Sequence, residues 1–234
     1  QTLGIYSYTP PRTYRCVMKL IMRTYIIILH IFPCLQLLLG YPTKYAAPGG
    51  AWRPAVFLPG WRWCPGGWGA RTPKASPTPI PTPLGMVFLH HSAGGARWAC
   101  NDKKSCIKAV RDIQDFHMDD RGWDDIGYSF LVGGDGRVYV GRGWGVQGAH
   151  TLGYNRLAHG ICIMGDYNAT LPDKAALRAT HKLFACGVRN GYTKCDYELF
   201  GHRDGRCTEC PGDALYRLMR TWPQYSTREI HRYC

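Results

Sequence analysis

The sequence predicts an α/β domain in which helices flank a mixed central β-sheet. From residue 84 onward, short apolar runs of strand length alternate with segments of helical periodicity. One glycine-rich Asp-Gly connection joins two β-rich runs, as in a hairpin. The 234 residues suffice for one domain of ordinary size with appendages. We therefore expect a single folded domain behind a Pro/Gly-rich N-terminal extension.

The residues before the domain divide into three segments. Residues 1–17 are upstream material of doubtful status, because Gln1 is not an initiator. Residues 18–40 have the basic start and apolar run of a signal peptide. The alternatives are an incidental apolar segment and a weak anchor, although the run is shorter than the roughly 20 residues of a stable membrane span.

Residues 41–67 are predicted to be a Pro/Gly/Trp-rich linker. Nine prolines between Pro48 and Pro83 disfavour a helix or an inner strand. The tryptophan-rich cluster at 61–68 is where we expect the chain first to contact the domain, with Cys64 as a candidate for a disulfide. The domain itself is assigned to residues 68–234.

The first half of the domain contains three strands and one helix. The run 86–90 predicts a buried strand, and 105–117 has apolar residues near helical spacing. Residues 128–132 and 137–140 predict two strands, which the Gly133-Gly134-Asp135-Gly136 connection joins as a hairpin.

The second half continues the alternation. The apolar run 160–164 predicts a strand, and 197–200 predicts another. Between them, Pro172 suits the first position of a helix that continues to about Val188. Its predicted apolar face is formed by Leu177, Thr180, Phe184 and Val188. A last helix, stopped by Pro223, is predicted to contain Leu215, Leu218, Met219 and Trp222.

The formal charge of +13 is mostly a property of the N-terminal part. Residues 1–101 hold ten of the 29 Lys and Arg and none of the 16 Asp and Glu, which leaves nineteen against sixteen for residues 102–234. A nucleic-acid-binding protein would concentrate its basic residues on a folded module with a recognisable motif. Because no such motif is present, we expect no nucleic-acid partner, and the charge fits attraction to anionic surfaces such as bacterial envelopes.

Eleven cysteines favour an oxidising compartment. Cys100 and Cys106 flank a short polar segment, and further bridge candidates are Cys64, Cys186, Cys195 and Cys207. The connectivity does not follow from the sequence. Cys162 lies in an apolar run, where a small buried hydrophobic role is the favoured interpretation.

Two histidines and one cysteine are the candidate metal ligands. His90 ends the first predicted strand, His202 follows the strand 197–200, and Cys210 comes eight residues later. Two imidazoles and a thiolate suit Zn²⁺, and three protein ligands with a fourth position for water are typical of a catalytic site. The sequence therefore predicts a zinc hydrolase. For His90 a hydrogen-bonded core role is the alternative, and no HExxH motif indicates a thermolysin-like site.

Several separated motifs resemble those of a peptidoglycan recognition protein and occur in the same order. The resemblance extends from about Trp68 to Tyr225. Its motifs are residues 68–71, 122–144, 148–150, 153–155, 183–188 and the segment from His202 to Cys210. Such proteins share a fold with zinc amidases of the phage-lysozyme type. The resemblance also implies a Cys100–Cys106 bridge.

The resemblance implies an activity through one residue. Members that only bind peptidoglycan usually lack the cysteine ligand, whereas amidases keep it, and here it is Cys210. The implied reaction is hydrolysis of the amide between N-acetylmuramic acid and L-alanine of bacterial peptidoglycan, by a secreted zinc enzyme of innate immune defence. The alternative is a non-catalytic peptidoglycan-binding pattern-recognition receptor, with a disulfide-rich adhesion module as a third hypothesis.

The resemblance further implies roles for individual residues. Tyr128 would be catalytic by orienting water or stabilising an oxyanion, and Thr208 would have a secondary polar role. Predicted substrate-binding residues are His91, Trp123, Gly143, Trp144, His150 and Asn155. His91 should face away from His90 by strand alternation. Core packing is the alternative for both tryptophans, a structural hydrogen bond is the alternative for His150 and Asn155, and structural or surface roles are expected for His117, His159, His181 and His231.

Three positions bear on specificity or depart from the usual family pattern. The pair Gly143-Trp144 resembles the form associated with diaminopimelate-type stem peptides. Ala158-His159 replaces the usual Ser-Ile, which puts the strand or groove wall there in doubt. Gly205 replaces the usual Val, and glycine is expected to loosen the loop between His202 and Cys210.

Overall fold

The computed structural model describes residues 63–64 and 67–234 of the chain. The predictions for residues 1–17 and 18–40, and most of the predicted linker, lie outside these described residues. None of the helices in the described part is both long and apolar enough to cross a lipid bilayer.

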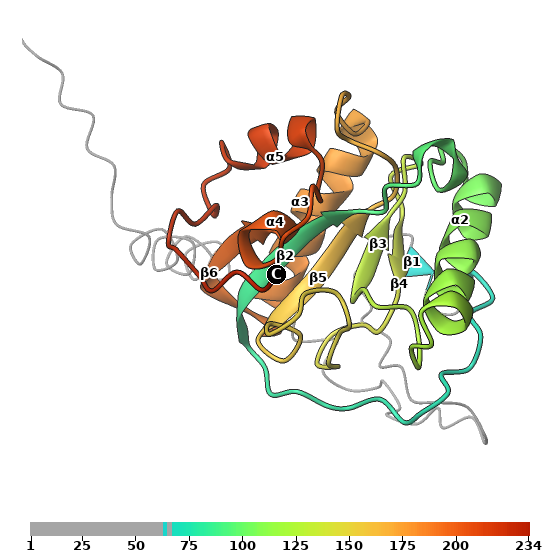
Figure 1. The fold of residues 1–234 in the computed structure, drawn as a ribbon, viewed down its shortest axis with the longest axis horizontal. Coiled ribbons are helices and arrows are strands. Elements are labelled where there is room, and N and C mark those ends of the chain that lie inside the picture. Colours follow the sequence, from blue (N-terminus) through green and yellow to red (C-terminus); the bar gives the residue numbers. More distant parts are fainter. Residues whose placement is uncertain (1–62, 65–66) are drawn as a thin grey trace, which may run out of the picture. The chain divides into compact units, whose positions relative to one another are not determined.

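A six-stranded mixed sheet forms the centre of the fold, in the order β1-β4-β3-β5-β2-β6 (Figure 1). Strands β3, β5, β2 and β6 run parallel to one another, and β4 is antiparallel to β3. The strand bounds are β1 Trp63–Cys64, β2 Leu84–His91, β3 Phe130–Val132, β4 Val138–Val140, β5 Ala158–Ile163 and β6 Thr193–Gly201. The mixed sheet and the β3–β4 hairpin are confirmed. Because β2 and β6 are parallel neighbours, their C-terminal ends lie at the same edge.

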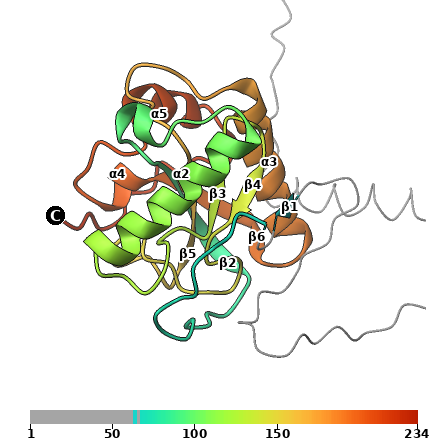
Figure 2. The same ribbon diagram turned by 90° about the vertical axis from the view of Figure 1, so that its right-hand side faces the viewer.

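Helices cover both faces of this sheet (Figure 2). The longer ones are α2 (Lys103–Asp115) and α3 (Lys174–Arg189), which pack on opposite faces, with α5 (Asp213–Met219) on the side of α3. Two short ones are the 3₁₀ turn η2 (Gly95–Arg97) and α4 (His202–Gly205). The flanked sheet agrees with the predicted fold class.

Helix α2 begins and ends differently from the prediction of 105–117. Asp102 caps its start, where its carboxylate accepts hydrogen bonds from the backbone N–H groups of Lys104 and Ser105. After Asp115 the chain continues as a π-helical turn, η3 (Phe116–Asp120). Such turns are wider than an α-helix and occur frequently at functional sites.

The last helix ends before the predicted residue Trp222. Helix α5 stops at Met219, and the N–H groups of Thr221 and Trp222 bond to the carbonyls of Leu218 and Met219 in a turn. A proline disfavours helical backbone at the residue before it, which here is Trp222. The helix therefore ends before Pro223.

The buried face of α3 differs from the predicted apolar face by a rotation about the helix axis. Thr180 and Phe184 are buried as expected, but Leu177 and Val188 are only partly buried. Small residues bring the helix close to the sheet: a Cβ on Gly187 would lie 2.6 Å from Thr193 Oγ1. The residues buried on this face are Ala176, Ala179, Thr180, Leu183, Phe184, Cys186 and Gly187.

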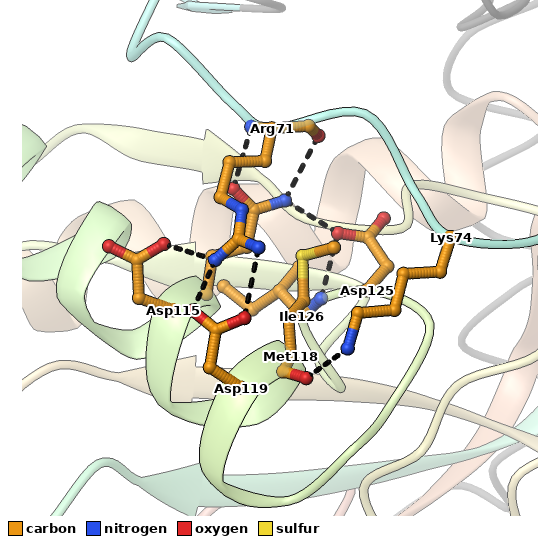
Figure 3. A network of polar contacts seen from close by, with 8 residues as sticks. Arg71, Lys74, Asp115, Met118, Asp119, Asp125 and Ile126 are labelled. Carbon is orange, nitrogen blue, oxygen red and sulfur yellow. Dashed lines mark hydrogen bonds and ion pairs between the residues drawn. The ribbon is translucent and has the colours of Figure 1, made fainter.

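The segment before β2 is fixed to the domain at several points. Strand β1 pairs with β4, and the fully buried Trp68 donates from its indole N–H to the carbonyl of Val140 at 3.0 Å. Figure 3 shows the next anchor, where Arg71 forms ion pairs with Asp115 at 2.8 Å and Asp119 at 2.5 Å. The described residues of the tryptophan-rich cluster, 63–64 and 67–68, thus contact the domain as expected.

Two disulfides are present with both partners described: Cys100–Cys106 and Cys207–Cys234. Cys195 is also disulfide-bonded. Buried free thiols in the described part are Cys162, Cys186 and Cys210. Cys186 is therefore not a bridge cysteine, contrary to its interpretation as a candidate: it is a free thiol buried on α3.

Candidate metal centre and binding cleft

The three predicted metal ligands meet at the edge where β2 and β6 end. His90 is the last residue but one of β2, His202 is the first residue of α4, and Cys210 follows in the next loop. One nitrogen or sulfur atom from each lies within 4.8 Å of the others. His90 was predicted to end the strand 86–90, and it lies in β2, which extends one residue further, through His91.

The donor set fits a zinc ion. His90 Nδ1 lies 3.8 Å from Cys210 Sγ, and the rings of His90 and His202 are 4.4 Å apart between centroids. Tetrahedral Zn²⁺ with bonds of about 2.0–2.1 Å to nitrogen and about 2.3 Å to sulfur requires neighbouring donors roughly 3.3–3.6 Å apart. Small side-chain movements are enough to reach that spacing.

Burial keeps both histidine ligands neutral. Desolvation, followed by the charges of neighbouring histidines, holds the pKa of His90 well below its usual value. Desolvation and then Arg206 lower the pKa of His202 to about 4. Each ring therefore offers a free nitrogen lone pair at neutral pH, as metal binding requires.

Cys210 is in the opposite situation. Burial raises the pKa of its thiol to about 12, although the backbone N–H of His91 donates to Sγ at 3.4 Å and partly offsets this. Its side chain retains 9% exposure. The sulfur thus needs a cation to become a thiolate, and a divalent metal supplies that charge.

A second ring orients His90. His150 Nε2 lies 3.3 Å from the Ala158 carbonyl, which can only accept, so this nitrogen carries the proton. His150 Nδ1 is then an acceptor, with the Thr151 hydroxyl at 3.0 Å and His90 Nε2 at 3.3 Å as its donors. With Nε2 of His90 donating, its Nδ1 is left free toward Cys210. This is the outer-shell arrangement that fixes the tautomer of histidine ligands.

The loop between His202 and Cys210 is held by its own polar groups. Thr208 Oγ1 accepts a hydrogen bond from the Cys210 N–H at 3.2 Å, and the Arg203 N–H donates to the Cys210 carbonyl at 2.9 Å. Gly205 is buried in α4, where a Cβ would lie 3.0 Å from the Phe88 ring. Gly205 was expected to loosen the loop. In the structure this position is closely packed instead.

A cleft of about 850 Å³ opens above the three ligands. It collects residues from β2, the π-helical turn, the segment before β3, the 149–155 loop and the ligand loop. Of the predicted site residues, those that line it are His91, Trp123, Tyr128, His150, Asn155, His202, Thr208 and Cys210. His90 lies beneath it, at 1% exposure.

Tyr128 lies beside the candidate metal centre. Its ring centroid is 5.2 Å from that of His90, and the side chain is half-buried. Burial, with smaller contributions from Cys162 and Cys210, raises the pKa of the phenol well above its usual value. The hydroxyl therefore keeps its proton, and its side-chain hydrogen bond in the structure is to the Cys162 thiol.

The other predicted groove residues divide between two places. Asn155 lines the cleft and also accepts hydrogen bonds from the N–H groups of His150 and Thr151, at 2.7 and 2.9 Å. Trp144 is instead buried in the core under α3, 4.3 Å from Phe130 between centroids. The structure brings neither Gly143 nor Trp144 to this cleft.

The departure at Ala158-His159 leaves strand β5 intact. His159 is fully buried, its Nε2 donates to the carbonyl of Tyr192 at 3.1 Å, and its ring meets the edge of Trp144. Desolvation lowers the pKa of His159 to about 4. The doubt about the strand is thereby resolved, and the ring lies in the core.

His117 is a cleft residue that the sequence analysis left as structural or surface. It lines the cleft, and its ring packs 4.7 Å from Trp123 and 5.4 Å from Tyr128 between centroids. The Gly127 N–H donates to its Nδ1 at 3.1 Å. Helical periodicity could not locate it, because it lies in the π-helical turn. Other lining residues that the sequence analysis missed include Arg121, Thr151, Asn168 and Arg206.

Comparison with known proteins agrees with this geometry. The family model described as N-acetylmuramoyl-L-alanine amidase matches residues 81–213. An N-acetylmuramoyl-L-alanine amidase of Sus scrofa is 49% identical over 160 residues, which are 68% of this chain and 27% of that protein. The chain thus spans less than a third of the length of this relative.

Solved structures show the same fold. Wild-type Drosophila PGRP-LB has a TM-score of 0.66 and 44% identity, covering 70% of this chain and 95% of that one. Peptidoglycan recognition protein LE, solved in complex with tracheal cytotoxin, has a TM-score of 0.67 and 40% identity, covering 70% and 94%. The chain therefore belongs to the N-acetylmuramoyl-L-alanine amidase family, together with the peptidoglycan recognition proteins that it resembles in sequence and fold.

Proposed function

We propose that the chain hydrolyses the amide bond between N-acetylmuramic acid and L-alanine of bacterial peptidoglycan, with Zn²⁺ as cofactor. The observation that carries this proposal is the convergence of His90, His202 and the free Cys210 at the floor of a cleft. A binding protein needs no buried sulfur and two imidazoles there. The family match supports the amide as the bond that is cut.

The cleft supports a muropeptide as the substrate. Trp123 and Tyr128 offer aromatic surfaces to a sugar or peptide stem, and Asn155 and His150 offer polar groups. Peptidoglycan recognition protein LE is solved with tracheal cytotoxin, a monomeric diaminopimelic acid-type peptidoglycan. We infer the same substrate class for this chain. Because Trp144 packs in the core, it would influence a preference for the stem peptide only through the walls of the cleft.

The catalytic step follows from the groups around the cleft floor. Zn²⁺ held by His90, His202 and Cys210 would act as a Lewis acid and lower the pKa of a bound water to about 7. Tyr128 would donate a hydrogen bond to the amide carbonyl oxygen as negative charge develops on it. His150 holds His90 in the tautomer that leaves Nδ1 free, and Thr208 holds the backbone of Cys210.

We infer secretion and a role in innate defence from the disulfides together with the family. Structural disulfides such as Cys100–Cys106 persist in oxidising compartments. A secreted amidase would meet bacterial cell wall outside the host cell.

The test is mass spectrometry of purified muropeptides after incubation with the zinc-loaded protein. We expect release of the intact stem peptide, loss of release with a chelator, and loss of release in Cys210→Ser with muropeptide binding retained. Binding without release at any zinc concentration would refute the amidase and leave a pattern-recognition receptor.

A further inference from the structure

The tail, residues 226–234, lies beyond the segment matched by the family model and packs against the candidate metal centre from behind. It starts at β6, where the Ser226 N–H donates to the carbonyl of Leu199 and Arg228 forms an ion pair with Glu198 at 2.6 Å. It then crosses to α4, and in Figures 1 and 2 its end lies beside α4.

The tail is joined to the loop that carries the cysteine ligand by three links. The Tyr233 N–H donates to the carbonyl of Gly205, and the Cys207 N–H donates to the carbonyl of Tyr233, both at 3.1 Å. The disulfide Cys207–Cys234 closes the same contact covalently. Cys207 is three residues from Cys210, so these links act on the middle of the ligand loop.

The tail also contacts the 149–155 loop, other residues of which line the cleft. The Tyr154 hydroxyl donates to the carbonyl of His231 at 2.7 Å, and a Cβ on Gly153 would lie 2.1 Å from the ring of Tyr233. Gly153 and Tyr154 belong to the loop that presents His150 and Asn155 to the cleft. One segment thus connects both loops whose positions define the candidate site.

Its apolar side chains pack directly beneath the ligands. Ile230 and Tyr233 pack on the cluster of Phe88, Tyr154, Ala158 and Phe200. Phe88 lies two residues before His90 on the same face of β2, and Ala158 supplies the carbonyl that orients His150. The tail therefore supports the floor of the site as well as its two loops.

The loop has other, non-covalent supports. The Tyr216 hydroxyl donates to the Asp204 carboxylate, Arg203 donates to the carbonyls of Glu209 and Cys210, and the His91 N–H donates to the Cys210 sulfur. The disulfide to the tail is its covalent support. A covalent link lowers the conformational entropy of the segment that it joins. If the ligands are already held in place before the metal binds, less free energy is spent on ordering them. The metal then binds more tightly.

We propose that the tail is a positioning element of the metal site, which holds Cys210 and His150 in register through Tyr233 and the Cys207–Cys234 disulfide. This inference rests on the zinc site of the proposed function. It assigns the tail an effect on metal affinity that is separate from its effect on folding.

The test compares two disulfides in the full-length chain. The variant Cys207→Ser/Cys234→Ser removes the link at the ligand loop, and the control Cys100→Ala/Cys106→Ala removes one at the start of α2. Zinc affinity is measured by competition with a chromophoric chelator, and backbone hydrogen exchange is measured on the zinc-free proteins. Thermal unfolding of the zinc-free proteins reports folding separately.

We expect the tail variant to bind zinc about tenfold more weakly, in the range typical for loss of outer-shell support, and to exchange amides of residues 203–210 faster. The control should lose thermal stability and keep the zinc affinity of the wild type. Tyr154→Phe, which deletes only the hydroxyl bonded to His231, should act in the same direction with the disulfide intact.

Unchanged zinc affinity and unchanged exchange of residues 203–210 in the tail variants would overturn the inference, as would an equal loss of affinity in the control. A wild-type chain that binds no zinc would refute the proposed function instead, and the exchange of residues 203–210 would then decide the role of the tail alone. Zinc binding without turnover would leave the tail inference standing.

Discussion

His90 and His150 face each other through ring nitrogens, with Nε2 of His90 3.3 Å from Nδ1 of His150 and their rings nearly perpendicular at 79°. Desolvation lowers the pKa of His150 to about 3, so the ring is neutral and its Nδ1 accepts. The contact joins a residue of β2 to the 149–155 loop. It thereby links a wall of the cleft to the orientation of a ligand.

This contact predicts an effect of His150 on zinc affinity. His150→Leu removes the acceptor, so His90 loses the partner that fixes its tautomer, and zinc should bind about 10–100-fold more weakly. In His150→Asn a side-chain oxygen can replace Nδ1, and part of the affinity should return. Competition titration with a chelator measures both. Equal affinities for wild type and His150→Leu would show that the contact does not orient the ligand.

Tyr128 should affect turnover and leave the metal in place. Tyr128→Phe deletes only the hydroxyl, so the ring packing on His90 and His117 remains. Loss of one hydrogen-bond donor to a developing oxyanion costs about 10²–10³ in kcat. We expect that loss in muropeptide hydrolysis with zinc affinity unchanged. A variant with wild-type kcat would remove Tyr128 from the proposed mechanism.

Substitutions of Trp123 and Trp144, the two tryptophans predicted to bind substrate, should have different effects. One should weaken muropeptide binding and the other should lower stability. Trp123 is half-buried at the cleft, so Trp123→Ala should weaken muropeptide binding by about tenfold with little change in unfolding. Trp144 is 7% exposed in the core, so Trp144→Ala should cost about 3–5 kcal/mol of stability. Calorimetric titration and urea denaturation distinguish them. The opposite pattern would mean that Trp144 reaches the substrate.

His159 should make the fold sensitive to acid. Its folded pKa of about 4 lies below the usual value of about 6.5, so between these pH values the unfolded chain binds a proton that the folded protein does not. Stability therefore falls as the pH drops through this window and is unaffected above it. His159→Ile removes the titrating group.

Relative to wild type, the variant should gain on the order of 2 kcal/mol between pH 8 and pH 5. The Tyr192 carbonyl that His159 leaves still accepts from the Leu84 N–H at 2.9 Å, so the substitution orphans no acceptor there. Urea denaturation at the two pH values provides the comparison. Parallel pH profiles for the two proteins would contradict the assignment.

Local patterns predicted most of the elements. The apolar run before His90, the Asp-Gly connection and the helical periodicity after Asp102 each depend on neighbours in the chain, and each element is present. The sequence-based predictions were wrong about where one helix ends and about which face of another helix is buried. Met219 replaces Trp222 as the end of α5, and small residues rotate α3, because close approach to the sheet decides these details.

The sequence was enough to predict which residue types form the candidate metal site. It was not enough to predict which other side chains line the cleft. Two histidines and a cysteine in suitable order indicated zinc, and all three converge. Whether an aromatic residue faces the cleft or the core depends on the tertiary packing of its loop, and Trp123 lines the cleft whereas Trp144 packs in the core. His117 lines the cleft because it lies in a π-helical turn, and such a turn leaves no periodic pattern of apolar residues in the sequence.

The sequence by itself determined the α/β class, the ligand chemistry and the family resemblance, because these depend on the identity and order of residues along the chain. Only the tertiary structure decided that β2 and β6 are parallel neighbours, that His150 lies against His90, and that residues 226–234 return to the ligand loop. Such contacts join residues that lie from 26 positions apart, as Cys207 and Tyr233 do, to 112 apart, as Leu89 and Gly201 do, and their formation depends on packing of the whole domain.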